Sequence, residues 1–485
     1  MRESTKVAKS SAKLLSAEFI NIIFGIFYFL IITRTFSKIE MAAIAIMGVI
    51  TNISAVVIGF GLHATSVKLI PEYLSKEENE NVSEILQITY ILVIFASIFF
   101  VFFTFLFSSQ ISSIFFKSPS YSNLIKIISF SIFTNKLFET SYHNLTAFQK
   151  FTEISLLQIM NNVFVRIYAL FLYFSSGIEG YLIGLITGQF IISICMIFLT
   201  KQYLFKKIKE HNFKKILKFS FPFYLNGYIG YGANHADSLI VSIFLSPSLI
   251  ATYYVVRRFI DYLEIFITSI LTPLSPKMVE MKKNGKETLE KIFYKSTRYL
   301  SFILIPTCLF MISISYFLLD IYGKGKYLSG LPILIILSLG MIFNGFYLLL
   351  RGTIFVCSKP IETTKVELFK ACINILLPLT LIRKFNILGI SCGKFISLFT
   401  SVFFAYYIGK KLLILKFDWE NIKKSFLISF FSVLLIIILQ ILFYTPFWMI
   451  LYICVGIIVF SLLFFKFTTQ DEKLFFKEIL LKWNN

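Results

Sequence analysis

The residues of this chain that could do chemistry are charged side chains inside otherwise apolar stretches. Arg257, Asp261 and Glu264 are spaced i, i+4 and i+7 and therefore share one face of a helix, with Arg258 slightly to its side. A charged group at the centre of a bilayer costs roughly 2.5–3.5 kcal/mol on insertion scales, so such residues usually face a bundle interior or an aqueous cavity. Two arginines in a cavity would suit an anion, because guanidinium groups bind phosphate oxygens in a bidentate manner.

Other interpretations of these residues stay open. Arg257 and Asp261 could form an ion pair within their helix that only lowers its own insertion cost. Asp237, on the preceding apolar stretch, is a candidate partner for Arg258. Four further basic residues could add to a cationic lumen, or could instead snorkel at helix ends or form local pairs: Arg166, Arg351, Lys370 and Lys394.

Polar side chains also form stripes along two apolar stretches. The first stripe lies in residues 219–245 at spacing i, i+4, i+8 and i+11: Asn226, Gly230, Asn234 and Asp237. The second lies in residues 14–33 at spacing i, i+3, i+7 and i+10: Glu18, Asn21, Gly25 and Tyr28. Each spacing returns to nearly the same direction around a helix, so each stripe is one polar face.

A shift of 209 residues carries three positions of the second stripe onto the first and Glu18 onto the neighbour of Asn226, and it repeats several other residues. It carries Gly180 and Gly184 onto Gly389 and Gly393. It also carries four polar residues onto identical ones: Lys117, Asn135, Lys150 and Glu153 onto Lys326, Asn344, Lys359 and Glu362. The chain is therefore interpreted as two copies of one unit. The repeated asparagines need not bind a ligand, because an asparagine inside a span more often forms hydrogen bonds between helices.

Composition assigns these stretches to a membrane. Of the 485 residues, 57% are hydrophobic and 15% are charged, and the mean hydropathy is +0.79, which a soluble chain cannot bury. We predict an all-α polytopic membrane protein with fourteen spans, near 14–33, 41–60, 86–107, 121–141, 152–174, 180–200, 219–245, 249–272, 299–319, 331–350, 366–382, 387–409, 425–442 and 447–465.

The distribution of charge predicts how the chain is oriented in the membrane, and the motifs that the sequence lacks exclude several classes of function. The net charge of +21 does not indicate nucleic-acid binding, because most of the 47 Lys and Arg fall in alternate loops, which predicts that both termini are cytoplasmic. No P-loop, Gly-x-Ser-x-Gly elbow or His-Glu-x-x-His helix occurs, and the outside loops are short, so we assign no catalytic residues. The four scattered histidines and six cysteines predict no metal site and no cofactor.

The repeat predicts the organisation of the domains. Six spans per copy give both copies the same orientation, related by an axis along the membrane normal. The expected parts are an N-terminal lobe (1–210), a C-terminal lobe (211–415), and an extra helix pair with a cytoplasmic tail (416–485). Such duplicated bundles typically form transporters with the substrate site where the halves meet.

Several segments resemble one known family. Residues 32–73 contain Thr-Arg-Thr-Phe-Ser, Gly-Phe-Gly-Leu and Val-Lys-Leu-Ile-Pro-Glu-Tyr, as in the opening of the polysaccharide and O-antigen export flippases, which belong to the multidrug/oligosaccharidyl-lipid/polysaccharide (MOP) superfamily. A departure is Met41-Ala42, where the family commonly has a glycine. Further similar segments, in the family's order, are Phe219–Pro222, Asp237–Ile240, Ala251–Tyr254, Pro276, Ile321–Tyr327 and Ser358–Pro360.

The resemblance implies a V-shaped pair of six-helix lobes that alternate between inward and outward openings. It implies transport of a polyprenyl-diphosphate-linked oligosaccharide across the cell membrane for polysaccharide biosynthesis, with the lipid tail in the bilayer. We expect Arg257, Arg258 and Arg166 to bind the anion, helped by Arg351, Lys394, Asn226 and Asn234. We expect Asp237, Asp261, Glu264 and Glu18 to serve in gating or in coupling to a proton or sodium gradient.

Alternatives remain for the function. Within the superfamily, the chain could be a lipid II flippase, which fourteen spans suit, or a cation-coupled multidrug exporter, which would want an acidic, aromatic lumen. From another class, it could be a membrane-embedded glycosyl polymerase or ligase, which the short outside loops disfavour. Besides membrane lipids, expected partners are polymerases or glycosyltransferases of a polysaccharide-assembly complex.

Overall fold

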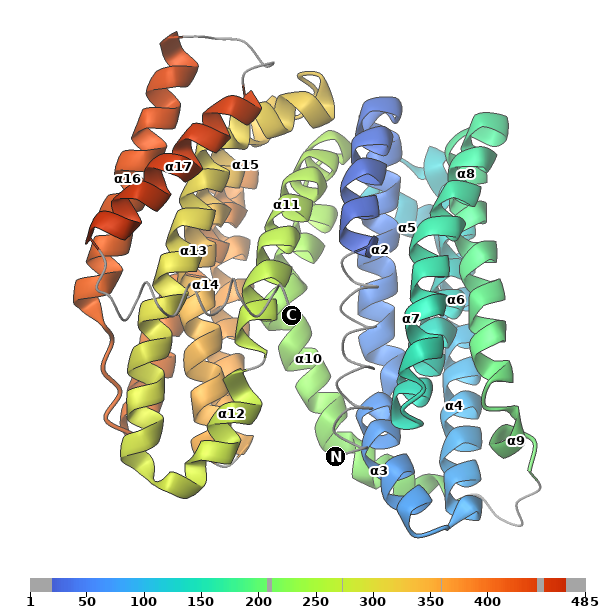
Figure 1. Cartoon of the computed structure of the whole chain (residues 1–485). Helices are drawn as coiled ribbons and strands as arrows, with labels where there is room; N and C mark the ends of the chain where they lie inside the picture. The colour runs from blue at the N-terminus through green and yellow to red at the C-terminus, as the bar shows by residue number, and fades with distance from the viewer. Residues whose placement is uncertain (1–19, 207–211, 273, 359, 443–448, 468–485) are drawn as a thin grey trace. The chain divides into compact units, whose positions relative to one another are not determined.

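The predicted fold class is confirmed. The computed structural model describes residues 20–206, 212–272, 274–358, 360–442 and 449–467, and within these ranges every regular element is helical (Figure 1). Each of the fourteen predicted spans coincides with a helix or with one arm of a bent helix; the first is seen from Ile20 and the last from Met449. Most helices are longer than the predicted spans, because polar residues that flank the apolar stretches are also helical.

The chain divides into two compact units, Met1–Tyr254 and Val255–Asn485, called unit 1 and unit 2 below. The predicted lobe boundary at 210/211 lies one span earlier in the chain, and the three predicted domain ranges stay a prediction. Unit 1 contains a helix over Ile20–Thr35 followed by α2 (Lys38–Gly59), α3 (Leu62–Ser75), α4 (Asn79–Leu106), α5 (Ser108–Phe115), α6 (Ser122–Ala147), α7 (Phe151–Ile159), the π-helical turn η2 (Met160–Phe164), α8 (Val165–Phe198), α9 (Lys201–Leu204) and α10 (Phe213–Phe244).

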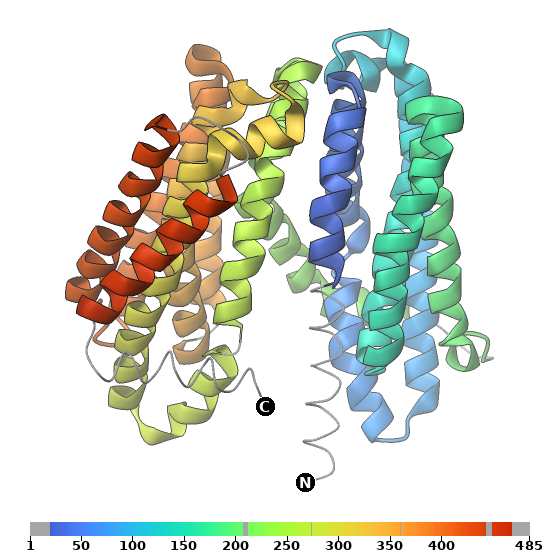
Figure 2. The same cartoon turned by 45° about the horizontal axis from the view of Figure 1, so that its top comes forward.

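Unit 2 is also a helical bundle. It begins within α11 (Pro247–Leu271) and continues through α12 (Leu274–Met281), α13 (Lys286–Gly323), α14 (Leu331–Cys357), α15 (Pro360–Lys410), α16 (Trp419–Leu442) and α17 (Met449–Phe467). The last two helices lie side by side in both views, and Phe302 of α13 packs edge-on against Phe464 of α17 with ring centroids 5.1 Å apart (Figures 1 and 2). Aromatic and aliphatic contacts of this kind hold the predicted extra helix pair to the rest of unit 2.

Two long helices contain the same sharp bend. In α8 the backbone leaves the helical region at Gly177 (φ 63°, ψ −149°), and in α15 it does so at Asn386 (φ 53°, ψ −134°). These positions differ by the repeat offset of 209 residues, and glycine and asparagine are the residues that adopt positive φ most readily. The sequence repeat is therefore also a repeat of backbone conformation.

The repeated glycines let the two arms of each bent helix touch. A Cβ atom on Gly180 would lie 2.4 Å from the carbonyl oxygen of Leu172, and one on Gly389 would lie 2.4 Å from the carbonyl oxygen of Leu381. Gly184 and Gly393 repeat this role one turn later, where a Cβ would meet neighbouring backbone atoms at 2.7 Å. Small residues at helix contacts allow the close packing that holds membrane bundles together.

A tight break separates α2 from α3. Phe60 and Gly61 both have positive φ, at 45° and 69°, and a Cβ on Gly61 would lie 2.2 Å from the carbonyl oxygen of Ser220 in α10. Only glycine fits at that second position. The break, which falls in the Gly-Phe-Gly-Leu motif, turns the short helix α3 so that His63 faces α6.

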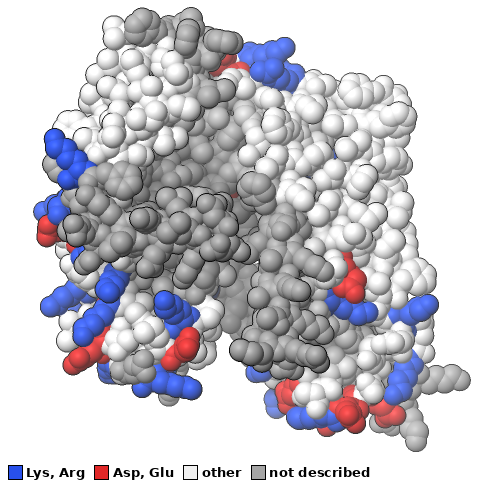
Figure 3. All heavy atoms as spheres, viewed as in Figure 1, with Lys and Arg blue, Asp and Glu red and all other residues white. Residues whose placement is uncertain are grey.

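The surface of unit 1 is that of a protein in lipid. In the face shown in Figure 3, charged side chains gather in the lower half of this unit, at the right of the view, and the surface above them is uncharged. Large apolar side chains on α4 are exposed, including Phe95 at 78% and Phe102 at 61%. Seven helices of the described chain are long and apolar enough to cross a bilayer by themselves, and two of these are the bent helices that hold two predicted spans each.

Candidate functional site

Three helices of unit 2 bring charged residues together inside the bundle. On α11, the Nε atom of Arg257 lies 3.0 Å from Oδ1 of Asp261, and its Nη2 atom lies 3.5 Å from Oε2 of Glu264. The helix-internal ion pair considered from the i, i+4 spacing is therefore present, and Glu264 joins it one turn further on. The side chain of Arg257 is 11% exposed, so this three-residue group is partly buried in the bundle.

Basic residues of α15 lie next to this group. Lys370 is buried; its Nζ atom donates to Oδ1 of Asn344 at 3.3 Å and lies 4.5 Å from the ring centroid of Tyr347. Lys394, which is also buried, and Arg257, Glu264 and Arg351 all act electrostatically on Lys370. We call the following residues the unit 2 charge cluster: Arg257, Asp261, Glu264, Arg351, Glu367, Lys370 and Lys394.

The cluster has polar atoms that are ready for a ligand. Arg351 of α14 forms an ion pair with Glu367 of α15, but its Nε atom is buried and has no hydrogen-bond partner among the described residues. The hydroxyl group of Tyr347, whose ring lies beside Lys370, is buried and lacks a partner in the same part of the chain. A buried donor without a partner costs free energy, so these groups favour a bound polar molecule or water.

In unit 1, the stripe on α10 runs from the surface into the bundle. Asn226 is exposed, Asn234 is half-buried and donates to the carbonyl oxygen of Gly230 at 3.0 Å, and Asp237 is fully buried. The hydroxyl group of Tyr253 donates to Asp237 Oδ2 at 2.5 Å. The carboxylate of Asp237 is thus held by a charge-assisted hydrogen bond that the spacing pattern did not reveal.

Arg166 lies in a second polar contact group of unit 1. Its Nη2 atom donates to Oδ1 of Asn162 at 3.0 Å, and its guanidinium carbon lies 5.4 Å from the ring centroid of Tyr28. The hydroxyl groups of Tyr28 and Tyr181 are hydrogen-bonded at 2.7 Å. Asn162 is in the π-helical turn η2, and such turns often occur at functional sites. The other expected residue of this face, Glu18, lies outside the described residues.

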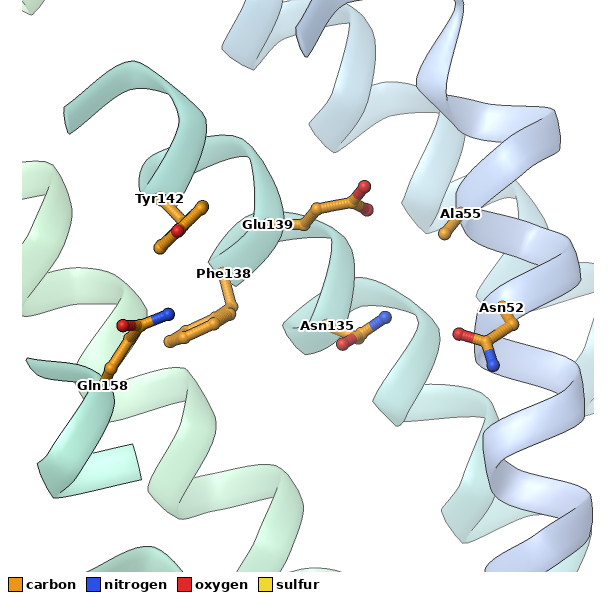
Figure 4. Close-up of a pocket in the computed structure, with 7 residues that line it drawn as sticks. All are labelled: Asn52, Ala55, Asn135, Phe138, Glu139, Tyr142 and Gln158. Atoms are coloured by element: carbon orange, nitrogen blue, oxygen red, sulfur yellow. The ribbon is translucent and has the colours of Figure 1, made fainter. Parts of the chain in front are cut away.

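Unit 1 also contains a cavity of about 440 Å³, shown in Figure 4. The side chain of Asn135 points toward Asn52 of α2, and its Oδ1 atom accepts a hydrogen bond from Gln189 at 3.4 Å. The sequence repeat indicated Asn135 but not the pocket, for which a charged residue inside a predicted span, Glu139, is the available signal. The lining residues are Asn52, Ala55, Asn135, Phe138, Glu139, Tyr142 and Gln158.

The structure thus sorts the expected site residues into groups. It brings Arg257, Asp261, Glu264, Arg351 and Lys394 together in unit 2, and it places Arg258 with its guanidinium carbon 5.3 Å from the ring centroid of Tyr262. Arg166 and the α10 stripe belong to unit 1 and form separate contacts there. Glu367 and Tyr347 are the members of the unit 2 site that the sequence did not indicate, whereas Lys370 was among the four further basic residues named from it.

Comparison with known proteins identifies the family. A family model described as "Polysaccharide biosynthesis protein" matches residues 31–331, which is more than half of the chain. The uncharacterized membrane protein MJ1068 of Methanocaldococcus jannaschii is 22% identical over 381 residues, covering 73% of this chain and 74% of that protein.

Solved structures show the same fold. The lipid II flippase MurJ in an inward closed conformation matches with a TM-score of 0.76 and 21% identity, over 96% of this chain and 99% of that one. An inward-facing multidrug resistance MATE family transporter of the MOP superfamily matches with a TM-score of 0.66 and 12% identity, over 82% and 97% of the two chains. The resemblance predicted from sequence is confirmed: this multi-pass membrane protein has the fold of MOP superfamily transporters and belongs to the polysaccharide biosynthesis protein family.

Proposed function

We propose that this protein translocates a lipid-diphosphate-linked oligosaccharide across the cytoplasmic membrane by alternating access, and so supplies polysaccharide biosynthesis. The observation that carries the proposal is the unit 2 charge cluster. It is placed on apolar helices of a chain that belongs to the polysaccharide biosynthesis protein family and has a flippase fold.

The chemistry of the cluster suits a diphosphate attached to a sugar. With all its side chains ionised, its four basic side chains exceed its three carboxylates by one charge, which favours an anion. The buried Nε atom of Arg351 is a hydrogen-bond donor without an acceptor among the described residues. Phosphate oxygens are strong acceptors for guanidinium groups. The hydroxyl group of Tyr347 can exchange hydrogen bonds with sugar hydroxyls.

The two carboxylates that pair with Arg257 allow the cluster two states, one without substrate and one with substrate bound. Asp261 and Glu264 neutralise Arg257 when no substrate is bound, and a diphosphate would compete with them for the guanidinium group. Protonation of either carboxylate would weaken the hold on Arg257, and protonation of both would release it for the substrate. Asp237 and Glu18 are further candidates for such gating or for coupling to a proton or sodium gradient, and Arg258, Arg166, Asn226 and Asn234 for contacts with the substrate headgroup.

The topology completes the proposal. The loop charges favour cytoplasmic termini, and with that orientation the substrate would be loaded from the cytoplasmic face, where nucleotide-activated sugars are used. Polymerases or glycosyltransferases that produce and consume the lipid-linked oligosaccharide are then the expected protein partners.

A second candidate within the superfamily is lipid II transport. The likeness of fold to the lipid II flippase supports it, and the same cationic cluster would bind the diphosphate of lipid II. A multidrug exporter has the fold likeness to the MATE transporter in its favour, but the surplus of basic side chains in unit 2 opposes a cationic drug.

The experiment that separates these candidates is a substrate comparison in vesicles that contain the purified protein. Fluorescent lipid-diphosphate oligosaccharide, lipid II and a cationic dye are each followed across the bilayer. The proposal expects translocation of the first, and a protein that moves only lipid II or only the dye would refute it. Asp237→Asn tests the coupling: normal transport by this variant, with the ion gradient present and with it collapsed, would exclude Asp237 from that role.

A further inference from the structure

Two of the four histidines of the chain meet in unit 1, far from each other in sequence. His63 is near the start of α3, and Glu139 and His143 are one turn apart on α6. Each of the three residues offers a ligand atom, and these atoms all lie within 4.8 Å of one another. The scattered positions of the histidines in the sequence gave no indication of this cluster, which depends on the break at Gly61.

The spacing of two donor atoms already matches a coordinated metal ion. His63 Nδ1 and Glu139 Oε1 are 3.1 Å apart and hydrogen-bonded to each other, so a metal ion would take the place of the proton between them. Two ligand atoms about 2.0–2.1 Å from a tetrahedral ion are about 3.3 Å apart, so an ion fits between this pair with little movement. The ring of His143 stacks on that of His63 with centroids 4.6 Å apart, and rotation of its side chain would bring in the third ligand.

Neighbouring groups orient the two ligands, as the outer contacts of metal sites do. Lys136 Nζ donates to Glu139 Oε2 at 2.9 Å and to the carbonyl oxygen of Ala55 at 2.9 Å, which leaves Oε1 for another partner. His63 Nε2 is 3.3 Å from the hydroxyl group of Thr140, so this nitrogen can carry the proton while Nδ1 offers its lone pair.

The charge and the surroundings of these three residues favour one class of metal ion. Lys136 neutralises Glu139, so the cluster has little net charge, and hard, oxygen-seeking ions such as Mg²⁺ or Ca²⁺ gain little from it. Two imidazoles and one carboxylate suit zinc and its neighbours in the first transition series. Glu139 also lines the 440 Å³ cavity, which provides an entry path and room for a water ligand (Figure 4).

We propose that His63, Glu139 and His143 form a binding site for a divalent transition-metal ion of the zinc type. The ion would fasten the short helix α3 to α6 and so fix one end of unit 1. This site is independent of the charge cluster in unit 2, and its test does not require transport activity.

The test measures metal binding by the full-length protein, purified without a histidine tag and stripped of metal. Equilibrium dialysis with Zn²⁺ should give one bound ion per chain, and Co²⁺ should produce the visible absorption of an ion with nitrogen and oxygen ligands. Bound Zn²⁺ should raise the apparent Tm by several degrees, because an ion that binds only the folded state stabilises it. Mg²⁺ should have neither effect.

Variants assign the site. His63→Ala, His143→Ala and Glu139→Gln should each weaken Zn²⁺ binding at least about tenfold. His235→Ala, which removes a histidine of α10 outside the cluster, should bind Zn²⁺ like the wild type. If a cluster variant fails to fold, nitrogen couplings from two imidazoles in the pulsed electron paramagnetic resonance spectrum of the Cu²⁺-loaded wild type decide the matter. Absence of stoichiometric Zn²⁺ binding, or equal loss of binding in His235→Ala, would overturn the proposal.

Discussion

Replacing a repeated glycine with alanine should change the stability of the protein, and the packing of the bent helix decides whether stability rises or falls. Replacing Gly180 with alanine adds one methyl group, which would lie 2.4 Å from the carbonyl oxygen of Leu172 in the other arm. Gly389→Ala makes the same change in unit 2, opposite Leu381. Gly48→Ala is a matched control, because a Cβ at this position of α2 has no atom within 4 Å.

The magnitude follows from two opposing effects. Alanine is favoured over glycine in a helix by roughly 0.5–1 kcal/mol, and this gain applies to all three positions. A carbon at 2.4 Å from an oxygen must move by almost 1 Å to reach an ordinary contact, and such overpacking costs about 1–3 kcal/mol. We expect a net destabilisation of about 1–2 kcal/mol at Gly180 and Gly389, and a stabilisation of about 0.5–1 kcal/mol at Gly48.

The assay is thermal unfolding of the purified variants in one detergent at one heating rate, because unfolding of large membrane proteins is generally irreversible. The apparent Tm should fall by several degrees for Gly180→Ala and Gly389→Ala and rise slightly for Gly48→Ala. If all three variants are stabilised to the same extent, the close approach of the two arms is wrong, and with it the physical role assigned to the repeated glycines.

Three further predictions concern other parts of the chain. Asn386→Val should lower the apparent Tm, because a β-branched residue disfavours positive φ by about 1–2 kcal/mol, whereas Asn386→Gly should not. Arg257→Gln should lower translocation at least about tenfold in vesicles with little loss of protein in the membrane, because Asp261 and Glu264 then repel the diphosphate; unchanged transport would exclude Arg257 from the site. Asp418, whose carboxylate is buried, should stabilise unit 2 in a pH-dependent way, and Asp418→Asn should remove this dependence from acid unfolding curves.

The sign of that pH dependence follows from the partners of Asp418, in the loop between α15 and α16. Burial by itself raises the pKa of Asp418, but hydrogen bonds from Asn421 and Arg298 outweigh it and hold the pKa below its ordinary value. A lowered pKa in the folded state means that the stabilisation is complete above the ordinary pKa and is lost as pH falls through the folded-state pKa. An acid unfolding midpoint that is identical in wild type and Asp418→Asn would contradict this assignment.

Much of the fold could be predicted because it depends on local pattern. Apolar length located the fourteen spans, and the 209-residue repeat contained the glycines that follow both sharp bends, although it did not predict the bends themselves. The ion pair of Arg257 and Asp261 was also accessible, since residues four apart on a helix are neighbours.

Contacts between distant segments could not be predicted in this way. The pairing of Arg351 with Glu367 joins two helices whose relative rotation no spacing reveals. The meeting of His63 with His143 depends on a turn that only the positive φ of Gly61 permits. The hydrogen bond of Tyr253 to Asp237 crosses from α11 to α10, so the pattern located the carboxylate but not its partner.

We propose that the unit 2 charge cluster binds the diphosphate of a lipid-linked oligosaccharide during its passage across the membrane. This is tested by the initial rate of translocation of labelled lipid-diphosphate oligosaccharide in vesicles, for wild type and for Arg351→Gln, which removes the guanidinium Nε donor. We expect rapid translocation by the wild type and a rate at least about tenfold lower for the variant, in line with the loss of a charge-assisted hydrogen bond of about 1.5–3 kcal/mol. Equal rates, or no translocation by the wild type, would contradict it.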